Sequence, residues 1–173
     1  SAQDYRGSGY DRGHLVSISD MRFRGQQATN EANYMTTITP QVPSVNRHTL
    51  YALEQYTRDL TRNGKQVVVM AGPVFSPMSE DGTIEYFVIG ENRLAVPTHF
   101  FRIIARVKAN GEPEALAFLV PNAVSAKTDT RKEASAYLTS ISNIEKLTGL
   151  SIFPLLADEQ KKKISTIQPT RLW

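Results

Sequence analysis

The segment Asp11–His14 (DRGH) places a histidine, an arginine and an aspartate within four residues of one another. A neutral imidazole near pH 7 can take a proton from water, and a guanidinium presents a planar pair of donors that matches two phosphate oxygens. Gly13 is expected to give the backbone a conformation that other residues avoid. A surface turn closed by a local salt bridge explains the same four residues, so both interpretations stay open at this point.

Asn46, Glu54 and Arg58 form a second group of polar side chains. Mg²⁺ prefers hard oxygen ligands and often keeps several waters, so the amide oxygen of Asn46 alone is enough to hold it. Glu54 is then placed to hold a metal-bound water, and Arg58 to neutralise charge that builds up on phosphate oxygens. The alternatives are a helix-capping asparagine and a solvent-facing ion pair between residues four apart. These residues indicate acid–base and metal chemistry but do not identify a substrate.

The composition describes a folded chain with a mildly basic balance. Its 173 residues are 40% hydrophobic, which is enough for one core, and no apolar run is long enough to span a bilayer. A total of 20 Lys and Arg against 17 Asp and Glu gives a net charge of +3, which suits a polyanionic partner without requiring one. The absence of cysteine excludes disulfides, thiolate catalysis and cysteine-based zinc sites. We expect a single domain over residues 1–173, because no repeat or linker divides the chain.

A helix from about Val45 to Arg62 is the element expected to carry the second polar group. Ser44 is expected to cap its N-terminus, which places Asn46 in the first turn. Four apolar residues share the side that faces the core: Leu50, Leu53, Tyr56 and Leu60. Alternation in Leu15–Ser19 predicts a short strand that continues out of the DRGH segment.

Short apolar runs predict three strands, over Lys65–Ala71, Phe100–Lys108 and Glu114–Val120. The first run is expected to be buried and to stop at Gly72-Pro73, and the other two to form a hairpin across Asn110-Gly111. A second helix is expected to start with the capping box Ser142–Glu145 and to end at Gly149. Strands mixed with a few helices, without regular βαβ alternation, indicate an α+β domain.

Longer stretches of the chain also carry a pattern known from other proteins. The stretch around the DRGH segment, residues 5–21, reads YRGSGYDRGHLVSISDM. It is followed in order by YMTTITPQ, VNRHTLYALEQYTRDL, VVMAGPVF, VPTHFFRIIA, AFLVPN and ISNIEKLTGLSIFPLL. These stretches resemble the DNA/RNA non-specific endonucleases with the ββα-metal (His-Me finger) fold. The resemblance covers about Asp4 to Leu156, with residues 157–173 as a C-terminal tail. It implies a central antiparallel sheet flanked by helices.

The resemblance implies a role for each of the main polar residues. His14 matches the general base that activates water for in-line attack on phosphorus. Asn46 matches the single protein ligand of the catalytic Mg²⁺, for which Mn²⁺ or another divalent cation can substitute. Glu54 matches the acidic residue that positions metal-bound water, and Arg58 matches an arginine that stabilises the charged transition state.

Three further positions are expected to act around these residues. Arg12 matches an arginine that contacts substrate phosphate, and Asp11 is expected to support the shape of the motif. Thr37 stands where family members often carry an asparagine, and its hydroxyl is a shorter and less versatile supporting group. Family domains also usually begin several tens of residues earlier, with strands and a further arginine. We therefore expect a partner chain, an inhibitor protein or a swapped segment to cover an open sheet edge.

The implied activity is Mg²⁺-dependent hydrolysis of phosphodiester bonds in DNA and RNA, with weak sequence preference and 5′-phosphate products. One alternative is a member that binds nucleic acid without cleaving it, and another is a nuclease toxin controlled by an inhibitor protein. A homodimer is compatible with either, and no membrane partner is expected. The resemblance favours a secreted, periplasmic or organellar location over the free cytoplasm.

Overall fold

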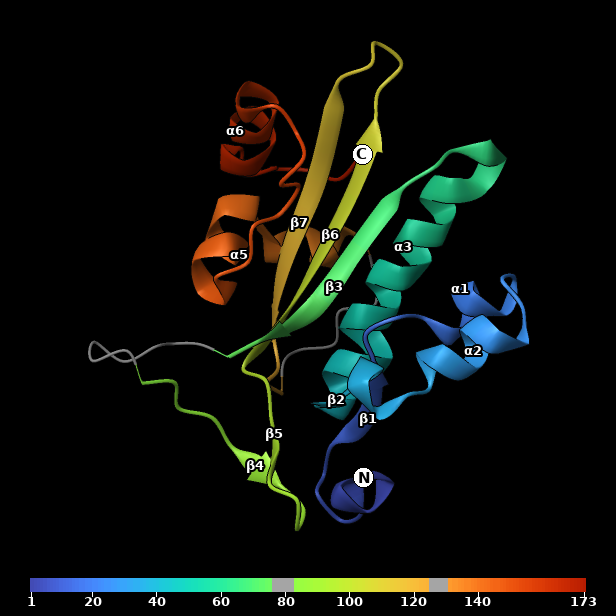
Figure 1. The fold of residues 1–173 in the computed structure, drawn as a ribbon, viewed down its shortest axis with the longest axis vertical. Helices are drawn as coiled ribbons and strands as arrows, with labels where there is room; N and C mark the ends of the chain where they lie inside the picture. Colours follow the sequence, from blue (N-terminus) through green and yellow to red (C-terminus); the bar gives the residue numbers. More distant parts are fainter. Residues whose placement is uncertain (76–82, 125–130) are drawn as a thin grey trace.

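The structure is a computed structural model that describes residues 1–75, 83–124 and 131–173. Its centre is a four-stranded antiparallel sheet in the order β3-β6-β7-β8. Figure 1 shows β3, β6 and β7 side by side. The strands are β3 (Val68–Val74), β6 (His99–Val107), β7 (Pro113–Pro121) and β8 (Leu138–Thr139). One face of the sheet is covered by α3 (Tyr51–Thr61), and the other by α5 (Ile141–Thr148) and α6 (Asp158–Thr166). The predicted α+β fold is confirmed.

Strands β6 and β7 form the predicted hairpin and contribute to both faces of the core. The turn closes where the Lys108 N–H donates to the Glu112 carbonyl at 2.9 Å, and Gly111 adopts a φ of +83°, which favours glycine. Successive side chains of a strand point to opposite faces, so each of these two strands contributes side chains to two hydrophobic clusters, one on each face of the sheet. The core against α3 includes Leu53, Phe100, Ile104 and Phe118. The core against α5 and α6 includes Phe101, Ile103, Ile141 and Ile144.

Strand β3 differs from its prediction in extent and in burial. It begins three residues later and runs through Gly72 and Pro73 to Val74, whereas a stop at Gly72-Pro73 was expected. A proline is tolerated here because, among the described residues, β3 pairs only with β6 and its outer edge needs no donor. Val68 is 60% exposed, so the start of the strand is not buried. The covering of this edge by a further chain or segment stays a prediction.

The predicted helix from Val45 to Arg62 is present, but its first part is not α-helical. Residues Val45–Leu50 form a π-helix, η3, and α3 follows directly. Leu53 and Tyr56 are buried in the core as expected, while Leu50 and Leu60 are partly buried. Ser44 does not cap the helix, because its backbone is already in the helical region.

The DRGH segment forms a short strand that ends earlier than predicted. Strand β1 (Asp11–His14) pairs antiparallel with β2 (Ile38–Gln41), and between them lie α1 (Ile18–Arg22), α2 (Gln26–Ala32) and the 3-10 turn η2 (Met35–Thr37). The strand predicted over Leu15–Ser19 is therefore wrong. The Ser17 carbonyl instead accepts the N–H groups of Asp20 and Met21, which starts α1.

The second capping prediction is also wrong by two residues. Ser140, not Ser142, caps α5, because its hydroxyl accepts the Asn143 N–H at 3.1 Å. The Ser142 hydroxyl instead donates to the Ser165 carbonyl of α6 at 2.9 Å, which ties α6 to α5. Gly149 ends α5 in the left-handed region, as predicted.

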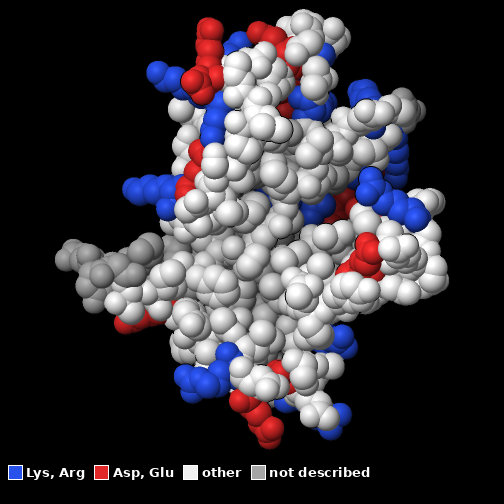
Figure 2. Space-filling model, viewed as in Figure 1, with Lys and Arg blue, Asp and Glu red and all other residues white. Residues whose placement is uncertain are grey.

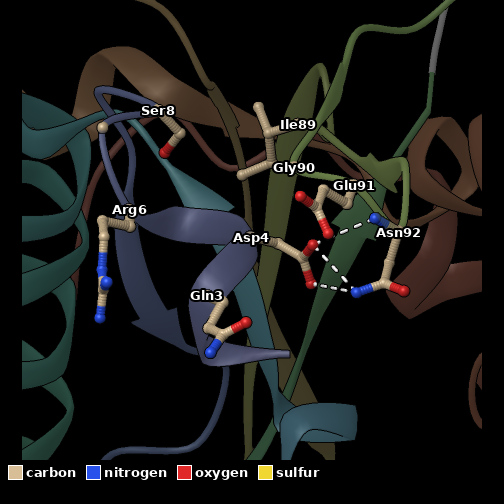
Figure 3. A pocket seen from close by; sticks show the side chains of 9 residues that line it. Gln3, Asp4, Arg6, Ser8, Ile89, Gly90, Glu91 and Asn92 are labelled. Atoms are coloured by element: carbon tan, nitrogen blue, oxygen red, sulfur yellow. Dashed lines mark hydrogen bonds between the residues drawn. The ribbon is translucent and has the colours of Figure 1, made fainter.

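The N-terminal turn η1 (Ala2–Tyr5) is fastened to the hairpin of β4 (Val88–Ile89) and β5 (Leu94–Ala95). Asp4 accepts the backbone and side-chain N–H groups of Asn92, each at 3.1 Å (Figure 3). The remaining elements are η4 (Arg62–Gly64), α4 (Arg131–Ala134) and η5 (Ser135–Tyr137). Within the described ranges, no helix combines the length and apolar character needed to cross a membrane.

Candidate active site

The β1–β2 pair and the helical segment η3–α3 bring the two polar groups of the sequence together. His14 ends β1 opposite Ile38, and Asn46 lies in the first turn of η3. A cleft of about 310 Å³ opens between them. Five predicted site residues line this cleft: Arg12, His14, Asn46, Glu54 and Arg58.

A larger cavity, of about 490 Å³, lies between the N-terminal turn and the β4–β5 turn (Figure 3). It is lined by Asp4, Glu91 and Asn92 among others, and its lining contains neither a histidine nor any predicted site residue. The Asp4 carboxylate is already engaged by Asn92. We therefore assign the chemistry to the smaller cleft.

Asp11 holds Asn46 in one orientation. The Asn46 Nδ2 donates to Asp11 Oδ2 at 2.9 Å, so the amide oxygen lies on the other side of the group. Arg47 donates to both carboxylate oxygens, from Nε at 2.8 Å and from Nη2 at 2.6 Å. Burial pushes the pKa of Asp11 up, but the hydrogen bonds from Arg47 and Asn46 outweigh it and keep this pKa below its ordinary value. Asp11 thus lies outside the cleft lining and acts on it through Asn46.

Gly13 is needed for space, and the expectation of an unusual backbone conformation is wrong. Its φ is not among the positive values of the chain. A Cβ at this position would overlap the side chain of Gln41, which faces it from β2. Gln41 is only 1% exposed, so its side chain is enclosed by its neighbours.

The Gly13→Ala variant is therefore expected to unfold more easily, by about 1–3 kcal/mol, as overpacked cores do. Urea denaturation of the variant and of the parent chain measures this difference. Gln41→Ala provides the matched background, since it removes the side chain that the new methyl group would meet. An equal loss of stability in both backgrounds would rule out this steric explanation.

Asn33 is a neighbour of His14 that the sequence did not reveal. The His14 Nε2 lies 3.2 Å from Asn33 Oδ1, and Asn33 Nδ2 donates to the Thr29 carbonyl at 2.9 Å. Because this second bond fixes the amide, its oxygen faces the ring, and we assign the proton to Nε2. The assignment leaves Nδ1 as the nitrogen with the free electron pair.

Thr37 supports the same loop without touching His14. Its hydroxyl lies 2.9 Å from the Ala32 carbonyl and 2.8 Å from the Tyr34 carbonyl, on either side of Asn33. Its own carbonyl accepts the Leu15 N–H at 2.9 Å, next to His14 in the chain. The threonine therefore contacts the backbone that carries the amide, and the amide itself comes from Asn33.

Arg58 is fixed at the side of the cleft by helix α1. Its Nε donates to Asp20 at 2.7 Å, its Nη2 donates to the Ser17 hydroxyl at 2.6 Å, and Glu54 lies 3.4 Å away. Burial lowers the pKa of Arg58, but the hydrogen bond and charge of Asp20 outweigh it and leave this pKa raised. Ser17 was missed because Leu15–Ser19 was predicted as a strand, and no element was predicted for Asp20. The start of α1 instead brings these two residues, three apart, to the same side, where both bind Arg58.

A buried arginine lies behind Glu54. Arg102 is only 6% exposed and points from β6 toward α3, between Phe100 and Ile104 on that face. Burial raises the pKa of the Glu54 carboxyl, and the charge of Arg102 is the strongest influence that lowers it, ahead of a hydrogen bond with Ser17. An arginine keeps its proton in proteins, so Arg102 stabilises the ionised form of Glu54. A charged residue within the apolar run of β6 was the sequence signal for it.

Arg102→Met is expected to raise the pKa of Glu54 further, because the charge that favours its ionised form is gone. If ionised Glu54 is needed for activity, the acid limb of the pH–rate profile should move to higher pH. Arg106→Met is the matched control, since Arg106 lies on the same strand and pairs with Glu114 at 2.6 Å. An unmoved acid limb in Arg102→Met, or an equal shift in both variants, would contradict the assignment.

Arginine side chains gather at the cleft, but among the described residues no large basic patch covers the face of the molecule seen in Figure 2. Arg12 and Arg47 are exposed and line it, while basic and acidic side chains are interspersed over the face of the molecule in Figure 2. Within the described ranges there is no cluster of three or more His, Cys, Asp or Glu side chains that could hold a metal ion. A cation in this cleft would therefore depend on few protein ligands.

Two antiparallel strands and a crossing helix, with a histidine on the first strand and an asparagine at the start of the helix, define the ββα-metal class of nuclease sites. A family model described as DNA/RNA non-specific endonuclease matches residues 1–159, and the chain belongs to this family.

Known proteins similar to the chain agree with this membership. It is 40% identical to human mitochondrial endonuclease G over 154 residues, which covers 87% of this chain and 50% of the relative. It is 36% identical to the mitochondrial nuclease EXOG of Xenopus laevis over 176 residues, covering 98% of this chain and 48% of the relative. The chain thus spans about half the length of these relatives.

A solved structure is also similar to this chain in its fold. It is a crystal structure of an EndoG/EndoGI complex, described as showing the mechanism of EndoG inhibition. The match has a TM-score of 0.79 and 33% identity, and it covers 92% of this chain and 65% of the other.

Proposed function

We propose that this chain forms the catalytic part of a divalent-metal-dependent endonuclease that hydrolyses phosphodiester bonds of DNA and RNA with weak sequence preference. The observation that carries the proposal is the convergence of His14, Asn46, Glu54 and Arg58 on one cleft, in a chain of this family. A module that only binds nucleic acid has no need for a base and an oxygen ligand side by side.

The residues of the cleft fit a hard divalent cation. Asp11 binds the amide nitrogen of Asn46, which leaves the amide oxygen of Asn46 available to a cation. Glu54 lines the same cleft as Asn46. Mg²⁺ accepts such a site because it keeps several waters, and Mn²⁺ has similar ligand preferences. When bound, the cation supplies Lewis-acid stabilisation to the phosphate oxygens and the leaving oxygen.

His14 takes the proton of the attacking water at Nδ1, while Asn33 holds the opposite side of the ring. The water oxygen forms a bond to phosphorus, and the bond from phosphorus to the 3′ oxygen breaks. The 3′ oxygen then takes a proton from a water that Glu54 orients by accepting its hydrogen bond. The products are a 5′-phosphate and a 3′-hydroxyl, and the proton on His14 then neutralises the hydroxide that the second water leaves behind.

Arg58 and Arg12 act on charge. Arg58 is held in place by Asp20 and Ser17, so its guanidinium faces the developing negative charge without reorganising. Arg12 is exposed at the cleft and suits a neighbouring phosphate, which positions the strand without reading its sequence. Weak sequence preference follows from contacts of this kind.

The experiment that tests the proposal is incubation of plasmid DNA, and separately of RNA, with the chain and Mg²⁺. We expect both substrates to be cut, cleavage to stop on addition of a chelator, and cleavage to return when Mg²⁺ is supplied in excess. Cleavage that continues in the chelator would overturn the metal-dependent mechanism. Binding of both substrates without any cleavage would favour the binding-only alternative.

Two further parts of the proposal rest on the relatives. A protein inhibitor that covers the cleft is one partner to test, because the similar solved structure is described as an inhibited complex. An organellar place of action is proposed because endonuclease G and EXOG carry the word mitochondrial in their names.

A further inference from the structure

Tyr51 is an aromatic side chain that the proposed mechanism does not use. It is the first residue of α3, it is 54% exposed, and it lines the same cleft as His14 and Asn46. Tyr56, five residues further along and therefore on a different side of the helix, is buried, and its hydroxyl is hydrogen-bonded to the backbone of Trp173. The helix therefore uses one tyrosine for the core and presents the other to the cleft.

The position of Tyr51 follows from helical spacing. Residues three, four and seven apart share one side of an α-helix, so Tyr51 lies in line with Glu54 and Arg58. Tyr51 and Arg58 both line the cleft. Arg47, four residues before Tyr51, also lines the cleft with a side chain that is 65% exposed. The aromatic ring of Tyr51 thus lines the same cleft as two arginines, one before it and one after it in the helical segment.

We propose that Tyr51 stacks on an unpaired nucleobase next to the phosphate that is cleaved, which makes single-stranded nucleic acid the better substrate. This inference rests on the proposed function. Aromatic rings flanked by basic side chains bind single strands in this way, because every base has a flat face that can stack. In a duplex the same faces are covered by neighbouring base pairs. Tyr51 therefore gains its contact only where the strand is unpaired or distorted.

The test compares kcat/KM on single-stranded and duplex oligonucleotides of the same sequence. Tyr51→Ala is expected to lower kcat/KM on the single strand by about 5- to 150-fold, mainly through KM, and to affect the duplex less. Tyr51→Phe keeps the ring and should keep the activity. Tyr86→Ala is the matched control, because Tyr86 is 50% exposed and packs against Phe75, outside the cleft.

A second substrate separates stacking from a structural effect. A single-stranded oligonucleotide with an abasic site beside the cleaved phosphate should be a poorer substrate for the parent chain but not for Tyr51→Ala. An abasic penalty that persists in Tyr51→Ala, or equal losses on single strand and duplex, overturns the stacking role. Cleavage that depends on His14 but ignores Tyr51 sinks only this inference, whereas no cleavage by the parent chain sinks the proposed function itself.

Discussion

His14→Ala is expected to cut the rate of phosphodiester cleavage by about 10²- to 10⁴-fold, the usual contribution of a positioned general base. The imidazole ends β1 at the cleft, and its Nε2 is held by Asn33, so Nδ1 is the nitrogen left to accept a proton. Water near pH 7 attacks phosphorus poorly without such a base. Single-turnover cleavage of a labelled oligonucleotide at saturating Mg²⁺ measures the loss, because it isolates the chemical step from product release.

Two controls make the His14 result specific. Added imidazole should restore part of the activity of His14→Ala, since a small base can enter the space that the ring leaves. Asn33→Ala keeps the base but frees its ring, so its loss should be smaller than that of His14→Ala. Full activity in His14→Ala, with an unchanged unfolding curve, would remove His14 from the mechanism.

Asn46→Ala is expected to lower activity at fixed Mg²⁺ by at least about 10²-fold, and to move the Mg²⁺ dependence to higher concentration. Loss of an outer partner of a metal ligand lowers metal affinity by about 10- to 100-fold, so loss of the ligand itself should exceed that range. Asp11→Ala is the comparison for the outer partner, because Asp11 contacts the amide nitrogen of Asn46 at 2.9 Å. Titration of activity with Mg²⁺ measures both effects.

The informative result is which of the two variants, Asn46→Ala or Asp11→Ala, loses more activity. Asn46→Ala should be more impaired than Asp11→Ala, and added Mg²⁺ should recover more activity in Asp11→Ala, where the oxygen ligand is still present. An unchanged Mg²⁺ dependence in Asn46→Ala would show that the cation is held elsewhere.

The polar residues of the site could be predicted because the chemistry of each side chain follows from its residue type. Four residues were singled out: His14 as the general base, Asn46 as the metal ligand, Glu54 as the carboxylate that positions metal-bound water, and Arg58 as the cation that neutralises phosphate charge. All four line one cleft in the structure. Their catalytic roles are what the variants above test. The helix that carries three of them was also predictable, since its apolar side repeats at helical spacing, with Leu53 and Tyr56 buried as expected.

The partners of these residues could not be predicted, because they meet only in the folded chain. Asn33 reaches His14 from the end of α2, and Arg102 reaches Glu54 from a strand in the middle of the sheet. The role of Gly13 depends on the side chain of Gln41 across a strand pair. Local patterns also mislead where a short segment fits two elements, as in Leu15–Ser19, which alternates like a strand but leads into α1.

The central claim is that water attacks phosphorus and that the 3′ oxygen leaves, with a divalent cation present. Cleavage of a defined oligonucleotide in isotopically heavy-oxygen water, with Mg²⁺, followed by mass spectrometry of both products, tests it most directly. We expect one heavy oxygen in each newly formed 5′-phosphate, none in the 3′-hydroxyl product, and no products in chelator. Heavy oxygen in the 3′ product, a cyclic phosphate from RNA, or equal cleavage without a divalent cation would contradict the account.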